Sequence, residues 1–497
     1  MAPARMSTIA LRTLLLVLLV LTACSQPSVQ PTQSATPAQS IGTESPSPTA
    51  GSSPTQTLTS AHMPRAQYTI NAILDYAGKH LDVEQTITSP NQTGEILSDL
   101  LLAVEPNFWP NCFSLTRLSI DDAPVNTYTL DGQRLTIMLT QPLSADTKLK
   151  VSLKYSLDLP EITTSDPNTQ RPRIFGYNAR QINLVNWYPF IVPYVPAQGW
   201  LLHDPWYYGE HLVYDMANYE VNLRPADAAI NPIIASSGNA KPNGEWTRYT
   251  LNAGRTFALS ASTEFQVAST TVGEVSVYSY YFPFYEKQGQ AVLQATAEAV
   301  ELFGEHFVPY PHISLSAVQA NFNDGMEFDG LYFLSNGFYN TYDKTPQNYL
   351  TFIAVHETAH QWWFGLVAND QALQPWLDES LCTYSEHIYY ETYYPDFVDW
   401  WWDYRVDYYA PEGWVDTIIY NGGGFRPYTN AVYLRGARFL EELRQRIGDE
   451  AFFAFLKDYT TQESGKRAAS QDFFAILSQH TSVEYSDILK TYFQNSS

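Results

Sequence analysis

The chain has 497 residues, of which 45% are hydrophobic and 16% charged, and its formal net charge is −23. Such a composition is typical of a globular protein with more than one domain and excludes a wholly disordered chain. The negative charge argues against a nucleic-acid partner and against a basic membrane-binding face, because both need clustered Lys and Arg.

Residues 1–23 have the features of an export signal. Arg5 and Arg12 form a positive region, and a short apolar run from Leu14 to Leu21 follows. This run is too short to span a bilayer comfortably, which favours a signal peptide over a transmembrane anchor. Residues 21–24 (Leu-Thr-Ala-Cys) resemble a bacterial lipobox, which implies cleavage before Cys24 and a diacylglyceryl group on its sulfur. The alternative is an ordinary signal peptide with a chance cysteine.

Residues 24–63 are predicted to form a disordered tether. The segment is rich in Ser, Thr, Pro and Gln and has no aromatic residue, so it cannot bury a core. We therefore expect an extracytoplasmic protein, anchored to the cell membrane by lipid on Cys24. Only Cys112 and Cys382 follow, so no disulfide framework is expected, although one pair could form.

Residues 64–270 have the period-two pattern of β-strands. Residues 148–155 (Lys-Leu-Lys-Val-Ser-Leu-Lys-Tyr) alternate polar and apolar side chains throughout, as a half-buried strand should. Similar runs occur at 67–76, 134–140, 213–224, 246–252 and 274–282. The pattern predicts an all-β domain, built as a sandwich or saddle of sheets.

The period becomes helical from about residue 283. Helices are predicted at 285–303, 346–366, 376–392, 430–447, 449–460 and 470–480, with a strand at 313–320. The predicted fold class is therefore α+β and multidomain, with a β domain at 64–270 and a mainly helical domain at 271–497.

The central motif is His-Glu-Thr-Ala-His at residues 356–360. Residues four apart on a helix lie on one face, about 5–6 Å apart, so His356 and His360 can reach the same Zn²⁺. Thr345 is expected to cap this helix, with Pro346 at its first position. The flanking residues are apolar, and polar groups among them need partners or a metal.

Glu379 is predicted to be the third metal ligand. It follows His360 after eighteen residues, in the segment Pro-Trp-Leu-Asp-Glu-Ser. A second helix packed on the first could present its carboxylate. Two His and one Glu would leave a fourth position of a single Zn²⁺ open, as a catalytic zinc requires. Glu357 lies beside this metal without binding it, and it can take a proton from water and pass it to the leaving amine.

These motifs resemble those of the gluzincin aminopeptidase family, which includes membrane alanyl aminopeptidase and leukotriene hydrolase. The likeness is close over residues 356–362 and 376–379, and in coarse order it covers about residues 65–497. Family members usually read Trp-Leu-Asn-Glu-Gly, so Asp378 and Ser380 are departures. The resemblance implies that the second domain is a thermolysin-like catalytic domain.

The same resemblance implies the remaining site residues. Tyr433, in Val-Tyr-Leu-Arg-Gly, matches the family's catalytic tyrosine, with Tyr428 as the competitor. Gly325, Met326 and Glu327 match the family's segment that binds the substrate amine, and Glu327 would bind the amine itself. Gly325 would let the backbone approach a peptide closely. The family's second amine-binding residue, in the β domain, has no counterpart that the sequence identifies.

The sequence thus predicts a zinc-dependent aminopeptidase acting on peptides. A zinc endopeptidase with the same ligands is an alternative, and blocked N-termini would distinguish the two. A surface-binding lipoprotein that holds zinc without turnover is a third reading. Oligomeric state and side-chain preference are not set by the sequence.

Overall fold

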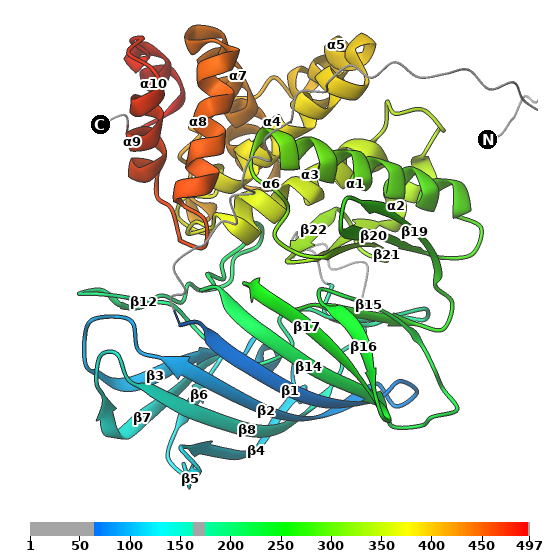
Figure 1. Ribbon diagram of the computed structural model, residues 1–497, viewed down its shortest axis with the longest axis vertical. Helices are drawn as coiled ribbons and strands as arrows, with labels where there is room; N and C mark the ends of the chain where they lie inside the picture. Colours follow the sequence, from blue (N-terminus) through cyan, green and yellow to red (C-terminus); the bar gives the residue numbers. More distant parts are fainter. Residues whose placement is uncertain (1–63, 163–173, 496–497) are drawn as a thin grey trace, which may run out of the picture. The chain divides into compact units, whose positions relative to one another are not determined.

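The computed structural model describes residues 64–162 and 174–495, so the predicted signal, tether and Cys24 lie outside the described residues. Strands predominate up to residue 281, and helices predominate from residue 286 onward (Figure 1). The predicted α+β order is confirmed. In the described part of the chain, no helix combines the length and the apolar character that crossing a membrane requires.

The β region is built around a large, mainly antiparallel sheet with the strand order β16-β17-β14-β1-β2-β8-β4-β5. Its strands are β1 (Ala66–Asp75), β2 (His80–Pro90), β4 (Phe113–Ile120), β5 (Ala123–Pro124), β8 (Lys148–Asp158), β14 (Ala217–Pro225), β16 (Asn239–Asn243) and β17 (Trp246–Gly254). Buried and less buried residues alternate along β1 and β8, as expected where one face of a sheet covers a core.

Shorter sheets, in the orders β15-β18-β10-β9 and β11-β3-β7-β6, and the pair β12-β13 belong to the same region. Their strands are β3 (Leu97–Ala103), β6 (Thr129–Asp131), β7 (Arg134–Leu143), β9 (Gly176–Tyr177), β10 (Ile182–Leu184), β11 (Phe190–Ile191), β12 (Tyr194–Val195), β13 (Gly199–Trp200), β15 (Ile233–Ser236) and β18 (Leu259–Ser262). Side chains from the large and the shorter sheets, such as Ile70, Leu102 and Leu259, share one buried core. This shared core is that of sheets packed face to face.

The second region contains a sheet in the order β19-β20-β21-β23-β22. Its strands are β19 (Gln266–Val272), β20 (Val275–Tyr281), β21 (Ser314–Ala320), β22 (Gly325–Phe328) and β23 (Leu331–Ser335). Along β23, Tyr332 packs in the core of the helices and Phe333 in the core of the β region. Every residue of β21 is also buried, as expected for a strand covered on both faces. The predicted boundary between residues 270 and 271 falls inside β19, which pairs with β20.

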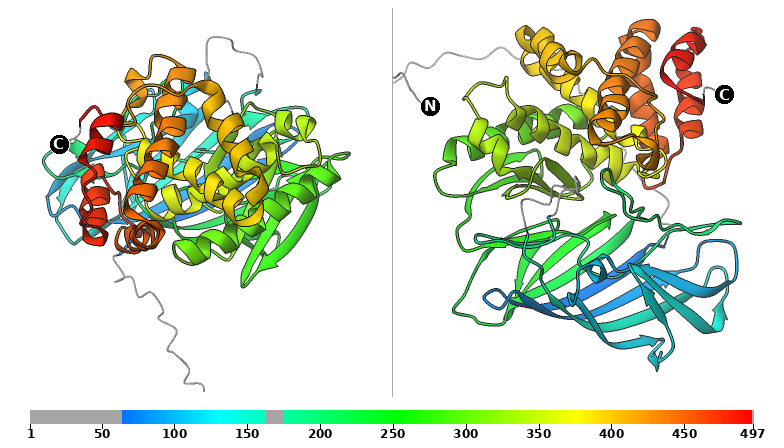
Figure 2. Two further views of the ribbon diagram at one scale, coloured as in Figure 1. Left: turned by 90° about the horizontal axis from the view of Figure 1, so that it is seen from above. Right: turned by 180° about the vertical axis from the view of Figure 1, so that it is seen from behind.

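Helices pack on this sheet. Helix α1 (Glu286–His306) contacts β19 and β20 and also α3 (Tyr349–His360), which in turn packs against α4 (Trp376–Tyr393) (Figure 1). Figure 2 shows these elements from above and from behind. The other helices are α2 (Asn336–Thr341), α5 (Val398–Trp401), α6 (Phe425–Thr429), α7 (Arg435–Ile447), α8 (Asp449–Gln462), α9 (Ser470–His480) and α10 (Ser486–Tyr492). Short 3-10 turns occur at Glu105–Phe108, Pro395–Phe397, Asp407–Tyr409 and Ile419–Asn421, and π-helical turns at Gln361–Leu366, Trp402–Val406 and Asn430–Leu434.

The start of α3 differs from the prediction. Asn348 is the cap, because its side-chain oxygen accepts a hydrogen bond from the Thr351 N–H at 3.1 Å. The predicted Thr345 cap is wrong, because the Thr345 hydroxyl accepts from the Gln347 N–H at 3.2 Å in the turn before the helix. The helix therefore begins at Tyr349 rather than at Pro346.

Arg255 from the β region fixes the far end of the same helical segment. Its guanidinium donates to the carbonyl oxygens of Gly365, at 3.0 Å, and Leu366, at 3.2 Å, which close the π-helical turn after α3. It also donates to the carbonyl of Lys466 at 2.8 Å. The last carbonyl groups of a helix lack N–H donors within the helix, and the Arg255 guanidinium supplies donors to two of them. This contact anchors the histidine-bearing helix to the β region.

The two cysteines that follow residue 24 are both free and buried, Cys112 in the core of the β region and Cys382 in that of the helices. They do not form a pair.

Candidate metal centre

Helix α3 presents the histidine motif to the interior. His356, Glu357 and His360 are all buried, and the two imidazole rings lie with centroids 4.9 Å apart. Their spacing of four residues places them on one face, as the sequence predicts.

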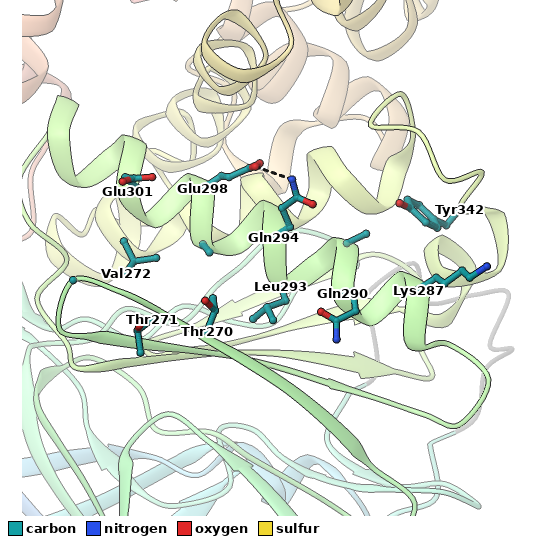
Figure 3. A pocket seen from close by; sticks show the side chains of 13 residues that line it. Thr270, Thr271, Val272, Lys287, Gln290, Leu293, Gln294, Glu298, Glu301 and Tyr342 are labelled. Atoms are coloured by element: carbon teal, nitrogen blue, oxygen red, sulfur yellow. Dashed lines mark hydrogen bonds between the residues drawn. The ribbon is translucent and has the colours of Figure 1, made fainter. Parts of the chain in front are cut away.

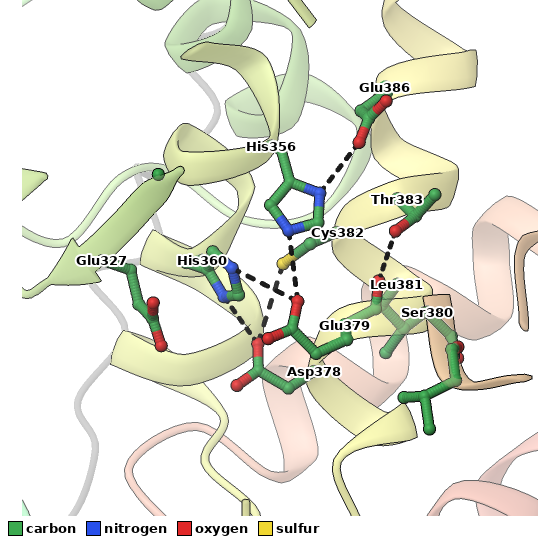
Figure 4. A network of polar contacts seen from close by, with 12 residues as sticks. Glu327, His356, His360, Asp378, Glu379, Ser380, Leu381, Cys382, Thr383 and Glu386 are labelled. Atoms are coloured by element: carbon green, nitrogen blue, oxygen red, sulfur yellow. Dashed lines mark hydrogen bonds and ion pairs between the residues drawn. The ribbon is translucent and has the colours of Figure 1, made fainter. Parts of the chain in front are cut away.

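Helix α4 brings Glu379 to the same point (Figure 4). Glu379 Oε2 lies 3.1 Å from His356 Nε2 and 3.7 Å from His360 Nε2. One potential ligand atom from each of the three residues lies within 4.8 Å of the other two, and all three residues are buried. The structure thus brings together the ligand set that the sequence predicts.

Carboxylates behind the two histidines orient the rings. His356 Nδ1 lies 2.9 Å from Glu386 Oε1, and His360 Nδ1 lies 2.7 Å from Asp378 Oδ1. These contacts favour a ring proton on Nδ1, which would leave both Nε2 atoms, the ones that face Glu379, free to bind a metal ion. Two imidazole nitrogens and one carboxylate oxygen thus surround a point at which one cation could bind all three atoms. This donor set suits Zn²⁺ with one coordination position left open.

The electrostatics of these groups also favour a cation. Burial lowers the pKa of His356, but hydrogen bonds with Glu379 and Glu386 outweigh it and raise that pKa to about 9. Burial raises the pKa of Glu379, yet the hydrogen bond from His356 and the charge of His360 hold it below its usual value. The buried carboxylates therefore create a strongly negative environment, which would hold a divalent ion.

Glu386 is itself fixed by a buried network that the sequence analysis missed. Arg405 donates to Glu386 Oε2 from Nε at 2.9 Å and to Oε1 from Nη2 at 2.8 Å. Trp401 Nε1 donates to Glu386 Oε2 at 3.0 Å. Glu386 follows Glu379 by seven residues, or two helical turns, so helical periodicity alone could have indicated that it shares the face of α4 that looks toward the histidines.

Glu357 lies beside the three ligands. Its carboxylate, the carboxylate of Glu327 and the imidazole of His360 each place an atom within 4.8 Å of the others. Among the described residues, Glu357 Oε2 has no hydrogen-bond partner although it is buried. Burial raises the pKa of Glu357 well above its usual value, and the charges of His360 and His356 offset part of that rise. A buried carboxylate in this position is suited to act as a general base.

The segment predicted to bind the substrate amine forms the edge strand β22. Gly325 and Met326 are partly exposed, and Glu327 is buried. The strand pairs with β23 on one side only in the part of the chain that the structure describes, so its other edge can receive an extended peptide. Burial raises the pKa of Glu327 to about 7, while the charge of His360 acts in the opposite direction. An ammonium group would stabilise its ionised form.

Tyr433 lies on a π-helical turn (Asn430–Leu434) over the metal ligands. Its ring is nearly parallel to that of His356, at 4°, with centroids 6.0 Å apart. A hydrogen bond from Tyr433 helps to lower the pKa of Glu379. Ser380, a departure from the family pattern, donates to the Val432 carbonyl at 2.7 Å and so ties this turn to α4.

The competing Tyr428 packs against Tyr433, with ring centroids 5.9 Å apart, and is fully buried. No described residue hydrogen-bonds to the Tyr428 hydroxyl. Of the two phenols, Tyr433 is therefore the one bonded to a ligand residue.

A further acidic residue of the β region, Glu210, lies near the site. Burial raises its pKa well above the usual value, and the negative charges of Glu327, Glu379 and Asp378 raise it further. Glu210 follows Gly209, which contacts Tyr428: a Cβ on Gly209 would lie 3.2 Å from the Tyr428 hydroxyl. The sequence analysis missed Glu210 because it lies in a stretch without strand or helix periodicity.

Comparison with known proteins agrees with this geometry. A profile of the peptidase family M1 domain matches residues 291–492. This match and the similar proteins below support a likeness to the gluzincin aminopeptidase family. The similar solved structures are zinc metallopeptidases, and the donor set of this centre fits that ion.

Among similar proteins, aminopeptidase M1-D of Oryza sativa subsp. japonica is 23% identical over 222 residues, which are 41% of this chain and 25% of the relative. Endoplasmic reticulum aminopeptidase 1 of Homo sapiens is 25% identical over 221 residues, covering 41% of this chain and 24% of the relative. The chain thus matches about a quarter of the length of these curated relatives.

Solved structures resemble the chain over most of its length. The M1 zinc metallopeptidase from Deinococcus radiodurans aligns with a TM-score of 0.61 and 17% identity, covering 87% of this chain and 94% of that one. A mutant of that metallopeptidase, solved with a Tyr-Ser-Ala substrate, aligns equally well at 18% identity. These likenesses support the order of a β-rich region followed by a helical region.

A separate hollow of about 660 Å³ lies between β19 and α1, away from the metal centre (Figure 3). Polar side chains such as Thr270, Gln290 and Glu301 line it, together with Leu293 and Tyr342. None of its lining residues belongs to the metal centre. It adds no group to the chemistry of the site.

Proposed function

We propose that this chain is a zinc-dependent aminopeptidase that removes N-terminal residues from peptides. The observation that carries the proposal is the convergence of His356, His360 and Glu379 beside the buried carboxylate of Glu357, whose Oε2 has no hydrogen-bond partner among the described residues. The aminopeptidases among its relatives, and the peptide held by a mutant of the similar metallopeptidase, point to the same substrate class.

Each residue has a role in this proposal. His356, His360 and Glu379 would hold one zinc ion. When bound, zinc acts as a Lewis acid and lowers the pKa of water near it. Glu357 accepts a proton from the attacking water and returns it to the leaving amine. Tyr433 donates a hydrogen bond to the oxyanion that develops on the scissile carbonyl.

Substrate orientation would come from β22. An extended peptide can add to its free edge, where the backbone of Gly325 and Met326 is partly exposed. Glu327, at the inner end of that strand, would pair with the α-ammonium group. Glu210 would supply a second carboxylate from the β region, the position that the sequence analysis could not assign. A free N-terminus is thereby required, which favours exopeptidase over endopeptidase activity.

The test combines metal analysis with paired peptide substrates. Purified protein should contain one zinc per chain, hydrolyse peptides with a free N-terminus and leave their acetylated counterparts intact. Glu357→Gln should lower kcat by about 10²–10⁴-fold, the range of general acid–base catalysis. The matched control is Glu301→Gln, an exposed carboxylate on α1, which should keep full activity.

Other outcomes would replace the proposal. Equal cleavage of acetylated peptides would make the protein an endopeptidase, and zinc-loaded protein inert toward a broad peptide panel would make it a binding lipoprotein. A second experiment distinguishes Tyr433 from its competitor: Tyr433→Phe should lower kcat by about 10²–10³-fold with little change in KM, and Tyr428→Phe should lower it far less.

We also propose that the protein is exported and anchored by lipid on Cys24. The support is the order of charged, apolar and lipobox-like residues at positions 1–24. Wild-type protein should incorporate radiolabelled palmitate and fractionate with membranes, and Cys24→Ala should do neither. Unlabelled wild-type protein in the soluble fraction would refute the anchor.

A further inference from the structure

Gln371 lies between the predicted amine-binding residue and the metal centre. It belongs to the turn that joins the π-helical segment after α3 to the start of α4, and it is buried. Its amide nitrogen donates to Glu327 Oε1 at 3.1 Å and to Asp378 Oδ2 at 2.8 Å. One side chain therefore bonds to carboxylates from two different elements, β22 and α4.

The chemistry of these partners fixes the orientation of the amide. Ionised carboxylates only accept hydrogen bonds, and a Gln side chain carries two N–H donors on one nitrogen. Turned the other way, the Gln371 carbonyl oxygen would face two negative groups and leave both buried carboxylates without a donor. The bridge to Glu327 and Asp378 thus has one workable arrangement.

Asp378 continues the connection to the metal centre. While Oδ2 accepts from Gln371, Oδ1 lies 2.7 Å from His360 Nδ1 (Figure 4). The result is an unbroken buried series of contacts from Glu327 through Gln371 and Asp378 to His360. An Asn at position 378, the usual residue of the family, would have one acceptor oxygen and an NH₂ group, so it could not accept from both partners on separate oxygens as Asp378 does. The acid at 378 and the amide at 371 therefore fit each other.

The turn that carries Gln371 is itself held in place. Asp370 Oδ1 accepts from the Leu373 N–H at 3.1 Å, and Asn369 Nδ2 donates to the Gln374 carbonyl at 2.9 Å. These two hydrogen bonds tie the backbone on either side of Gln371 to side chains of the same turn, and the two carboxylates hold its amide from within. Gln371 is consequently a rigid bridge rather than a mobile side chain that meets two acids by chance.

We propose that Gln371 is a positioning residue that couples Glu327, at the substrate-amine site, to the metal ligand His360 through Asp378. Its removal should loosen both ends together: Glu327 loses the donor that aims it at the amine, and Asp378 loses the donor that holds it behind His360. The part that concerns the amine rests on the proposed aminopeptidase function. The part that concerns the metal does not, because metal affinity can be measured without turnover.

The test is Gln371→Leu, which keeps the approximate size of the side chain and removes both donors. Gln374→Leu is the matched control, because its side chain bonds to the Ser470 N–H and hydroxyl at the start of α9 and not to the site. Zinc affinity is measured by chelator competition, and kcat and KM are measured with an aminoacyl chromogenic substrate. Outer partners of metal ligands typically change metal affinity by 10–100-fold.

We expect Gln371→Leu to weaken zinc binding about tenfold and, in zinc-saturated enzyme, to raise KM about tenfold with a smaller change in kcat. Gln374→Leu should change neither. In a Glu327→Ala background, Gln371→Leu should no longer affect KM but should still weaken zinc binding. A change in only one readout, or an equal change in the control, overturns the coupling. Wild-type protein that binds zinc but hydrolyses nothing refutes the proposed function, and the zinc affinities of the two variants then decide whether Gln371 supports His360.

Discussion

Gly325 offers a direct test of the site, because the Glu357 carboxylate occupies the space that a side chain at position 325 would need. A Cβ at position 325 would lie 2.0 Å from Glu357 Oε1, 2.6 Å from its Cδ and 2.9 Å from Ile353 Cγ2. The sequence analysis expected this glycine to make room for a peptide. In the structure it makes room for the proposed general base.

The size of the effect of Gly325→Ala follows from that contact. An ordinary Cβ contact is about 3.4–4 Å, so the Glu357 carboxylate must move by more than about 1 Å. Misplacement of a catalytic group by about 1 Å can cost about 10²-fold in rate. The backbone is not strained, because Gly325 is absent from the residues with a left-handed φ. Overpacking should cost only about 1–3 kcal/mol of stability.

The assay compares kcat, KM and thermal unfolding for the wild type, Gly325→Ala and Gly304→Ala. A Cβ at Gly304, on α1, meets nothing within 4 Å, so this control should keep full activity and gain up to about 1 kcal/mol of stability. We expect Gly325→Ala to remain folded and to lose about 10²-fold in kcat. A folded Gly325→Ala protein with kcat within threefold of the wild type would refute the role of Glu357 as the base.

Three further predictions concern the surroundings of the site. Glu386→Ala leaves the half-buried Arg405 without its carboxylate, so the free energy of unfolding in denaturant should fall by about 3 kcal/mol. Zinc affinity should fall at least about tenfold, and unchanged zinc affinity would show that Glu386 does not support His356. Chelation should abolish peptide hydrolysis and lower the melting temperature, because zinc at about a thousand times its Kd adds about 4 kcal/mol of stability, and stoichiometric zinc should restore both; an unshifted melting temperature would argue against a structured metal site. Burial raises the pKa of Glu441, but hydrogen bonds with His387 and Tyr384 outweigh it and lower that pKa from 4.5 to about 2. The stabilisation by Glu441 is therefore complete above about pH 4.5 and is lost as the pH falls toward 2, so melting temperatures of the wild type and Glu441→Gln should differ most near neutral pH and converge at pH 2. A difference that does not vary with pH would contradict this.

Periodicity predicted which helices and strands exist better than it predicted the residues at which they begin and end. The helix at 470–480 and the strand at 313–320 agree with the structure to within one residue. The start of α3 was misplaced because Thr345, Pro346 and Asn348 all carry start signals, and only the hydrogen bond from the Thr351 N–H to Asn348 decides among them. The strand predicted from residue 213 begins at Ala217, since an apolar segment can pack without pairing.

The residues of the candidate site also fall into two groups, those that a local pattern predicts and those that only tertiary packing reveals. Residues near one another on a helix, such as His356, Glu357 and His360, could be assigned from spacing alone. Gln371 and Glu210 could not, because a glutamine in a turn and an acid in an irregular segment carry no periodic signal. Their importance comes only from what lies opposite them in space.

The sequence alone determined the chemistry of this protein: which groups could bind a metal, which could exchange a proton, and that a β-rich region precedes a helical one. These follow from side-chain type and from the short-range geometry of helices and strands, which repeats every few residues. Tertiary structure alone decided which nitrogen of each histidine faces the metal, because that depends on carboxylates eighteen and thirty residues farther along the chain. It also decided that the Glu357 carboxylate occupies the space beside Gly325 and that the Gln371 amide hydrogen-bonds to two carboxylates. Such contacts depend on how separate elements pack, and packing follows from the whole set of buried side chains rather than from any local pattern.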